Sequence, residues 1–225
     1  MAETNEASVA TERLIDRLAV TASPVRRLRP PVLRAALWLL TVAAVATPLV
    51  LMFADLDATT RRWRNPMVSL ELASALLAGV SGVVAAFQLS LPDRGRAWAL
   101  LPMPFLALWI ATSGAGCYAT WLRTGDTGLE LGEGATCFGF ILGTGLPLGA
   151  SLLWMLRRAR PLSPGPVAAM GGLGAAALGA VLLQFFHPFD ITVMDLGMHA
   201  LAVAVIVATA SLSSRISPRP PAIPT

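Results

Sequence analysis

Two cysteines and two histidines are the side chains of this sequence best suited to metal or redox chemistry. Cys117, Cys137, His187 and His199 each stand near one end of an apolar segment, and the four segments are different ones. If successive segments cross a membrane in alternating directions, these four ends lie on the same side. Cysteine and histidine together bind borderline metals such as zinc. The spacing therefore predicts a candidate site at one face of a helical bundle.

Three interpretations of this candidate site stay open from the residues alone. A transition metal such as zinc could be held by cysteine and histidine together. Alternatively, Cys117 and Cys137 could form a disulfide in an oxidising compartment, which would join the ends of the loop 118–136. The third interpretation is two buried thiols and two hydrogen-bonded histidines that hold no ligand. The spacings match no standard metal motif, so they do not choose among the three.

Six apolar segments must position these residues, and each is long enough to cross a hydrocarbon core, which takes about 20 residues. The segments are 33–53, 68–89, 98–121, 135–156, 166–186 and 193–212. Only 13% of the chain is charged, whereas a soluble domain carries about 25%. We therefore predict an all-α fold, a polytopic membrane bundle of about six transmembrane helices over residues 33–212. A segment 1–32 with a short amphipathic helix precedes it, and a tail 213–225 follows it.

The arginines predict the orientation of this bundle. The chain has 17 arginines and no lysine, and a topology with both termini in the cytoplasm places 13 of them inside and 4 outside. Cytoplasmic segments carry an excess of basic residues, so we expect both termini to be cytoplasmic. The four exceptions are Arg61, Arg62, Arg64 and Arg123. Because topology accounts for the basic residues, we expect no direct nucleic-acid binding.

Ionisable side chains are scarce inside the apolar segments. Glu71 and Asp195 stand near segment ends, and His199 is the only titratable side chain well inside a segment. Ion paths and proton relays depend on such residues, so a small transporter or channel for a metal ion or hydrophobic substrate is the alternative function and not the preferred one. The sequence also has no nucleotide-binding loop, paired catalytic carboxylates or serine-triad pattern, and we expect no enzymatic activity.

The segment 1–32 is the part of the chain able to reach a soluble partner. Leu14, Ile15 and Leu18 fall on one face of a helix predicted over residues 8–20. The other face carries Glu12, Arg13, Asp16 and Arg17. An isolated helix of this length is marginal in water and folds when its apolar face meets a groove or a membrane surface. The mixed charge favours a protein groove over lipid, and a frayed tail is the third interpretation.

Small residues recur at every fourth position in two of the apolar segments. They are Gly139, Gly143, Gly145 and Gly149 in the fourth segment, and Gly171, Ala175 and Gly179 in the fifth. Such stripes let helix backbones approach closely in lipid. We therefore predict a compact bundle.

Several stretches, in the same order and at similar intervals, resemble the NrsF-like family of bacterial inner-membrane anti-sigma factors. The most specific is Pro24-Val-Arg-Arg-Leu-Arg-Pro-Pro31, followed at once by the first apolar segment. The others are Gly116-Cys117-Tyr-Ala-Thr-Trp121, Gly134-Ala-Thr-Cys137-Phe-Gly-Phe-Ile141 and the Leu-Leu-Trp-Met-Leu-Arg-Arg that ends the fourth segment. The resemblance covers nearly the whole chain and implies a six-helix protein that controls an extracytoplasmic-function sigma factor.

The resemblance also implies roles for the residues singled out above. The helix around Leu14, Ile15 and Leu18, with Arg13 and Arg17 beside them, would hold the sigma factor at the membrane. The cluster of Cys117, Cys137, His187 and His199 would sense an envelope, metal or oxidative signal and release it. Both roles are expectations that rest on the resemblance alone.

One departure from the family pattern concerns the sensing chemistry. The family has a His-Cys-Pro-x-Asp motif after the fifth segment, and its cysteine pairs functionally with the one at Cys137. This chain reads Phe186-His187-Pro188-Phe189-Asp190 there, so the second thiol is replaced by His187. A pair of Cys137 and His187 could still bind a soft metal but could not form a disulfide. Sensing by thiol oxidation would require Cys117 as the partner.

Overall fold

The structure is a computed structural model that describes residues 2–21, 28–125, 131–186 and 192–215. Its helices are α1 (Ala2–Thr21), α2 (Pro31–Phe53), α3 (Leu56–Trp63), α4 (Pro66–Leu89), the 3₁₀ helix η1 (Arg96–Leu100), α5 (Met103–Thr124), α6 (Leu131–Arg157), α7 (Pro164–Phe186) and α8 (Val193–Arg215). Within the described ranges six helical stretches are long and apolar enough to cross a membrane. The predicted fold class, an all-α multi-pass membrane bundle, is therefore confirmed.

Proline sets several of the helix boundaries. Pro31, Pro66 and Pro164 each occupy the first turn of a long helix, where proline costs no hydrogen bond because the first backbone N–H groups have no partner within the helix. These helices consequently begin two residues earlier than the apolar pattern predicts. The third membrane-crossing stretch, Arg96–Thr124, starts as η1 and continues as α5 after Pro102.

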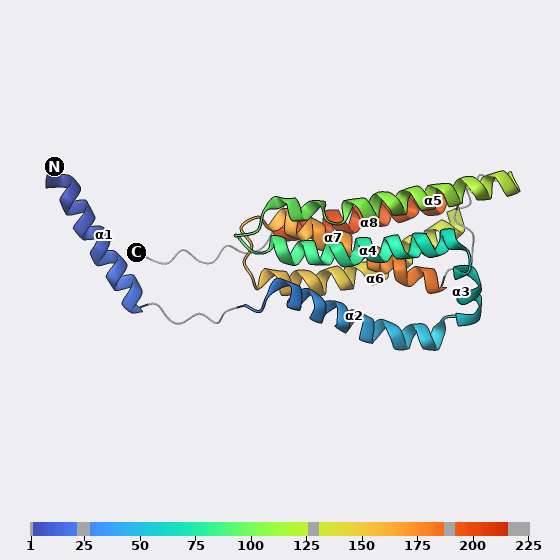
Figure 1. The fold of residues 1–225 in the computed structure, drawn as a ribbon, viewed down its shortest axis with the longest axis horizontal. Coiled ribbons are helices and arrows are strands. Elements are labelled where there is room, and N and C mark those ends of the chain that lie inside the picture. The colour runs from blue at the N-terminus through green and yellow to red at the C-terminus, as the bar shows by residue number, and fades with distance from the viewer. Residues whose placement is uncertain (1, 22–27, 126–130, 187–191, 216–225) are drawn as a thin grey trace.

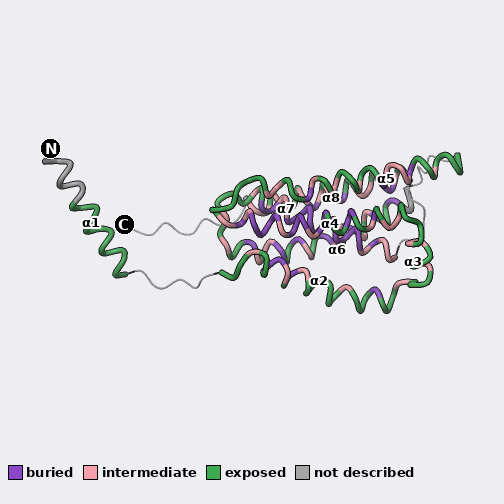
Figure 2. Tube along the Cα trace, viewed as in Figure 1, coloured by how far each residue is buried: buried purple, intermediate pink, exposed green. Residues whose placement is uncertain are grey.

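The centre of the bundle is α7, packed most extensively on α4 and also on α6 and α8. Figure 2 shows the buried residues concentrated on α4, α6 and α7. The contact between α4 and α7 depends on glycine, because a Cβ at Gly174 would lie 2.8 Å from the backbone nitrogen of Val83. A Cβ at Gly82 would lie 3.0 Å from Cα of Gly174. The two backbones therefore touch almost directly.

The predicted small-residue stripes are only partly right. In the fifth segment Gly171 packs against α6, and a Cβ at Gly179 would lie 2.9 Å from Oγ1 of Thr144. In the fourth segment a Cβ at Gly145 would lie 2.6 Å from Cδ1 of Ile206, whereas a Cβ at Gly139 or Gly143 would meet nothing within 4 Å. This pair lies away from the helix contacts of the described bundle, so the spacing alone did not identify the packed face.

The first membrane-crossing helix, α2, is fixed to the bundle by its first two turns. The buried Arg34 donates from Nη2 to the carbonyl oxygen of Met155 at 2.9 Å, and Nε1 of Trp38 lies 3.1 Å from Oγ of Ser151. Met155 belongs to the last turn of α6, where carbonyl groups have no partner within the helix. Arg34 therefore acts as a cap for α6, and its guanidinium carbon lies 4.9 Å from the ring centroid of Phe87.

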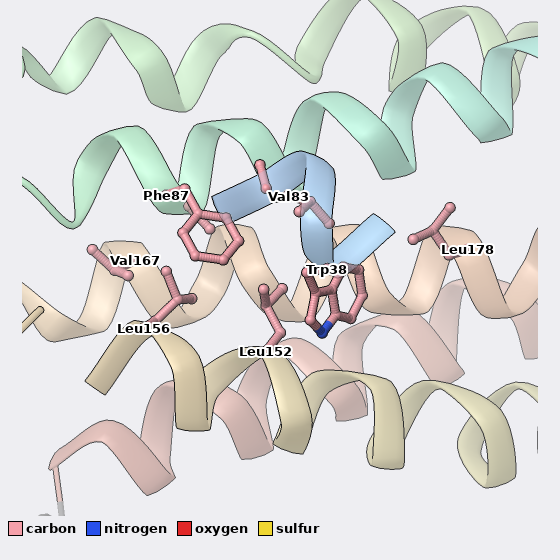
Figure 3. Packing of buried hydrophobic residues seen from close by; sticks show 9 residues of the cluster. Trp38, Val83, Phe87, Leu152, Leu156, Val167 and Leu178 are labelled. Carbon is pink, nitrogen blue, oxygen red and sulfur yellow. The ribbon is translucent and has the colours of Figure 1, made fainter. Parts of the chain in front are cut away.

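Figure 3 shows the apolar cluster that surrounds this anchor, with Trp38 of α2 above Leu152 of α6 and close to Val83 of α4. Beyond it, α2 leaves the bundle, and its distal part lies exposed at the edge (Figures 1 and 2). Pro48 lies in that distal part. The start of α2 is thus the place where the N-terminal segment joins the packed core.

Two helices, the 20-residue α1 and the 8-residue α3, lie outside the packed core. The amphipathic helix predicted over residues 8–20 is present as the longer α1, which lies apart from the bundle in Figure 1. The helix α3 was not predicted, and its first turn is capped by the carboxylate of Asp55, which accepts from the backbone N–H of Ala58 at 2.8 Å. It joins α2 to α4 at the end of the bundle far from α1, which we call the distal end.

Candidate functional site

The start of α8, at the distal end, is built on a reciprocal cap. Oδ2 of Asp195 accepts from the backbone N–H of Thr192 at 3.2 Å and from its hydroxyl at 2.9 Å. In return, the backbone N–H of Asp195 donates to Oγ1 of Thr192 at 3.2 Å. This is a capping box, which satisfies backbone donors that the helix itself cannot. It holds the Asp195 side chain, 3% exposed, in one orientation.

Both cysteines contact this cap. Sγ of Cys137, at the start of α6, is fully buried and lies 3.7 Å from Oδ1 of Asp195. Sγ of Cys117, near the end of α5, donates to the carbonyl oxygen of Thr192 at 3.2 Å. Residues 117, 137 and 192–195 thus join three helices through sulfur and oxygen contacts. We call Cys117, Cys137, Thr192, Asp195 and His199 the Asp195 cluster.

His199 belongs to the same cluster through the backbone. Its Nδ1 lies 2.7 Å from the carbonyl oxygen of Asp195, one helical turn earlier. A carbonyl oxygen only accepts, so Nδ1 carries the proton in this contact. The imidazole lies 6.3 Å, centroid to centroid, from the ring of Trp109 on α5. His187, the fourth member of the predicted cluster, lies outside the described residues.

The chemistry of the cluster, as far as the described residues show it, is that of thiols beside one buried carboxylate. Cys117 and Cys137 are both free thiols in the structure. Among the described residues no three histidine, cysteine, aspartate or glutamate side chains gather as a set of metal ligands. Of the predicted pair of Cys137 and His187, the structure describes only the cysteine. The metal and disulfide interpretations therefore stay predictions.

A second buried acid lies at the distal end, on α4. The side chain of Glu71 is 5% exposed, and its Oε1 accepts from the hydroxyl of Ser113 on α5 at 2.9 Å. Arg62 of α3 lines a pocket together with Glu71. Burying a carboxylate is costly unless donors compensate it, and Ser113 supplies one such donor. Glu71 therefore connects α4 and α5.

The predicted docking face is on α1 and is accessible. Leu14, Ile15 and Leu18 are 57%, 58% and 61% exposed, which is unusual for three neighbouring aliphatic side chains on one helix face. Arg13 and Arg17 are exposed beside them. The structure thus leaves this apolar face uncovered and places it at the end of the bundle opposite the Asp195 cluster (Figure 1).

Sequence reasoning gave little weight to Asp195 and Glu71, which turn out to be the two acids around which the distal end is organised. A signal for Asp195 was present, since Thr192-x-x-Asp195 has the spacing of a capping box. Glu71 had no such signal, because Ser113 lies 42 positions away in the chain. The arginines of residues 26–34 were expected to orient and anchor the first membrane-crossing helix, but the contact of Arg34 with Met155 was not foreseen.

Comparison with known proteins found one family that matches the chain. The sequence model of the NrsF family, described as the negative regulator of sigma F, matches residues 18–218. The match runs from Leu18 on the exposed face of α1 through all six membrane-crossing stretches. No curated protein and no solved structure matched the chain. Because the matched region is nearly the whole chain, the resemblance read from the sequence motifs is confirmed, and the protein belongs to the NrsF family of negative regulators of sigma factors.

Proposed function

We propose that this membrane-bound anti-sigma factor sequesters an extracytoplasmic-function sigma factor through α1. The observation that supports the proposal is the uncovered face of Leu14, Ile15 and Leu18 on a helix that lies apart from the bundle. An amphipathic helix that presents apolar residues at such spacing binds in a groove of a partner protein. Holding the sigma factor at the membrane would keep it from RNA polymerase.

The apolar face is large enough to contribute useful affinity. Full burial of a leucine or isoleucine side chain stabilises by about 1.5–3 kcal/mol, and more than half of each of these three side chains is still available for burial. Part of that gain offsets the ordering of α1, because helices gain most of their stability from packing and α1 lies apart from the bundle. Arg13 and Arg17 would then contact acidic residues at the rim of the groove.

This function requires α1 on the cytoplasmic side. The arginine distribution supports that orientation in the bacterial inner membrane, with both termini cytoplasmic. The distal end, with α3 and the Asp195 cluster, then faces the periplasm. In this arrangement a periplasmic signal and a cytoplasmic partner act on opposite ends of one bundle.

For release, the Asp195 cluster is the proposed sensing element. In this cluster Cys117 of α5 contacts Thr192, and Cys137 of α6 and His199 of α8 contact Asp195. A change at the thiols, by oxidation or by binding of a transition metal such as zinc together with His187, would alter the contact with Asp195 and the packing of α6 on α8. Because α6 also carries the carbonyl group that holds Arg34 of α2, the same helix reaches the anchor of the N-terminal segment.

A capture experiment with the full-length protein in nanodiscs tests the docking role. The double variant Leu14→Asp/Leu18→Asp should weaken capture of the cognate sigma factor by about a hundredfold or more, since each change removes at least about 1.4 kcal/mol. Val20→Asp is the matched control, because Val20 is 87% exposed and lies on the opposite side of α1. Unchanged capture by the double variant would show that α1 is not the docking element.

A further inference from the structure

A pocket at the distal end of the bundle is lined by three arginines. It lies between α3, α4 and α5 and encloses about 510 Å³. Arg61 and Arg62 come from α3, and Arg123 comes from the last turn of α5, about sixty positions later in the chain. We call it the arginine pocket. It does not include any of the cysteines or His199.

The three arginines of the pocket do not follow the usual excess of basic residues on the cytoplasmic side. In the expected orientation only Arg61, Arg62, Arg64 and Arg123 lie outside. Three of these four line this one pocket, while Arg64 does not. Positive charge that opposes the usual rule and converges from two separate helices indicates a local electrostatic purpose.

Polar and apolar side chains both line the pocket. Glu71 lines it and is buried, with Ser113 donating to its carboxylate. Three arginines and one carboxylate are thus among the residues that line the pocket. Met67 and Val68 of α4 and short side chains of α5 form the rest of the lining. The pocket therefore suits a ligand with an anionic group and an apolar part beside it.

We propose that the arginine pocket binds a phosphate-bearing anion. Guanidinium groups recognise phosphate through paired N–H donors, and three of them around one opening match the several oxygens of that group. Two sources have this chemistry, the headgroup of an anionic phospholipid in the adjacent leaflet and free phosphate in solution. The apolar wall favours the lipid. The site is independent of the role of α1, because it lies at the other end of the bundle.

Binding can be measured on the full-length chain in a maltoside detergent, which contains no phosphate. One arm titrates inorganic phosphate by calorimetry, and the other titrates phosphatidylglycerol in mixed micelles and counts retained lipid by native mass spectrometry. Arg61→Gln/Arg123→Gln should weaken binding by about tenfold or more in the arm that shows saturable binding, since the charged hydrogen bonds of two guanidinium groups are lost. Arg64→Gln/Arg94→Gln removes the same charge outside the pocket and should leave binding unchanged.

A second variant guards against loss of folding. Ala119 is exposed on α5 and lines the pocket, so Ala119→Phe should fill the space and weaken binding while every arginine stays in place. Saturable binding of phosphatidylglycerol that the pocket variants weaken supports the lipid as the source, and the same result with inorganic phosphate supports free phosphate. Absence of saturable binding in both arms, or an equal loss in the Arg64→Gln/Arg94→Gln control, would overturn the proposal.

Discussion

Sγ of Cys137 lies 3.7 Å from Oδ1 of Asp195, in a position where neither side chain is reached by solvent. The two residues belong to α6 and α8, which pack against each other along the bundle. The same carboxylate closes the cap at Thr192, whose carbonyl oxygen accepts from Cys117. One aspartate therefore joins helix capping to both thiols, and any chemical change at either sulfur alters the surroundings of that carboxylate.

The first prediction concerns the cap. Asp195→Ala should lower the free energy of unfolding by about 1–3 kcal/mol, because it removes two hydrogen bonds at the half-buried start of α8 and the acceptor of the buried Cys137 thiol. The measurement is an equilibrium unfolding titration of the full-length protein in mixed micelles. Asp93→Ala is the control, since the Asp93 side chain is 71% exposed and should change stability by less than about 0.5 kcal/mol.

The second prediction concerns the redox state of the thiols. The native protein should react slowly with a maleimide reagent at both cysteines, because Cys117 is 6% exposed and Cys137 is fully buried. After unfolding in detergent without any reductant, two thiols per chain should react, as expected for free cysteines. Cys117→Ser should then show one reactive thiol. A wild-type protein with no reactive thiol after unfolding would show instead that the two cysteines are joined by a disulfide.

The elements of the fold that depend on local pattern could be predicted from the sequence, and those that depend on register could not. Six apolar stretches of sufficient length determine six membrane-crossing helices regardless of how they pack. Which small residues face a neighbour depends on helix rotation, and for this reason Gly174 at the central contact was missed while Gly139 was expected to pack. The contacts of Glu71 and Arg34 were missed for a second reason, because their partners Ser113 and Met155 are distant in the chain.

The third prediction tests the backbone contact between α4 and α7. Gly174→Ala should destabilise the bundle by about 1–3 kcal/mol, because the added methyl group would lie 2.8 Å from the backbone nitrogen of Val83 and 3.0 Å from the carbonyl oxygen of Gly79. Backbone atoms in two packed helices cannot move aside individually. Gly139→Ala adds the same methyl group where nothing lies within 4 Å, so it should be neutral or stabilising by up to about 1 kcal/mol. Equal effects of the two substitutions would contradict the close contact between α4 and α7 at Gly174.

The last prediction separates anchoring of α2 from docking by α1. Arg34→Ala should lower the free energy of unfolding by about 1–2 kcal/mol, because a cation at the C-terminus of α6 and its hydrogen bond to Met155 are lost together. Arg29→Ala, at an exposed position just before α2, removes the same charge and should have little effect. Capture of the sigma factor by detergent-solubilised Arg34→Ala should be unchanged, since Leu14 and Leu18 stay available on α1. If Arg34→Ala weakened capture as strongly as the Leu14→Asp/Leu18→Asp variant, docking by α1 would depend on the anchor at the start of α2.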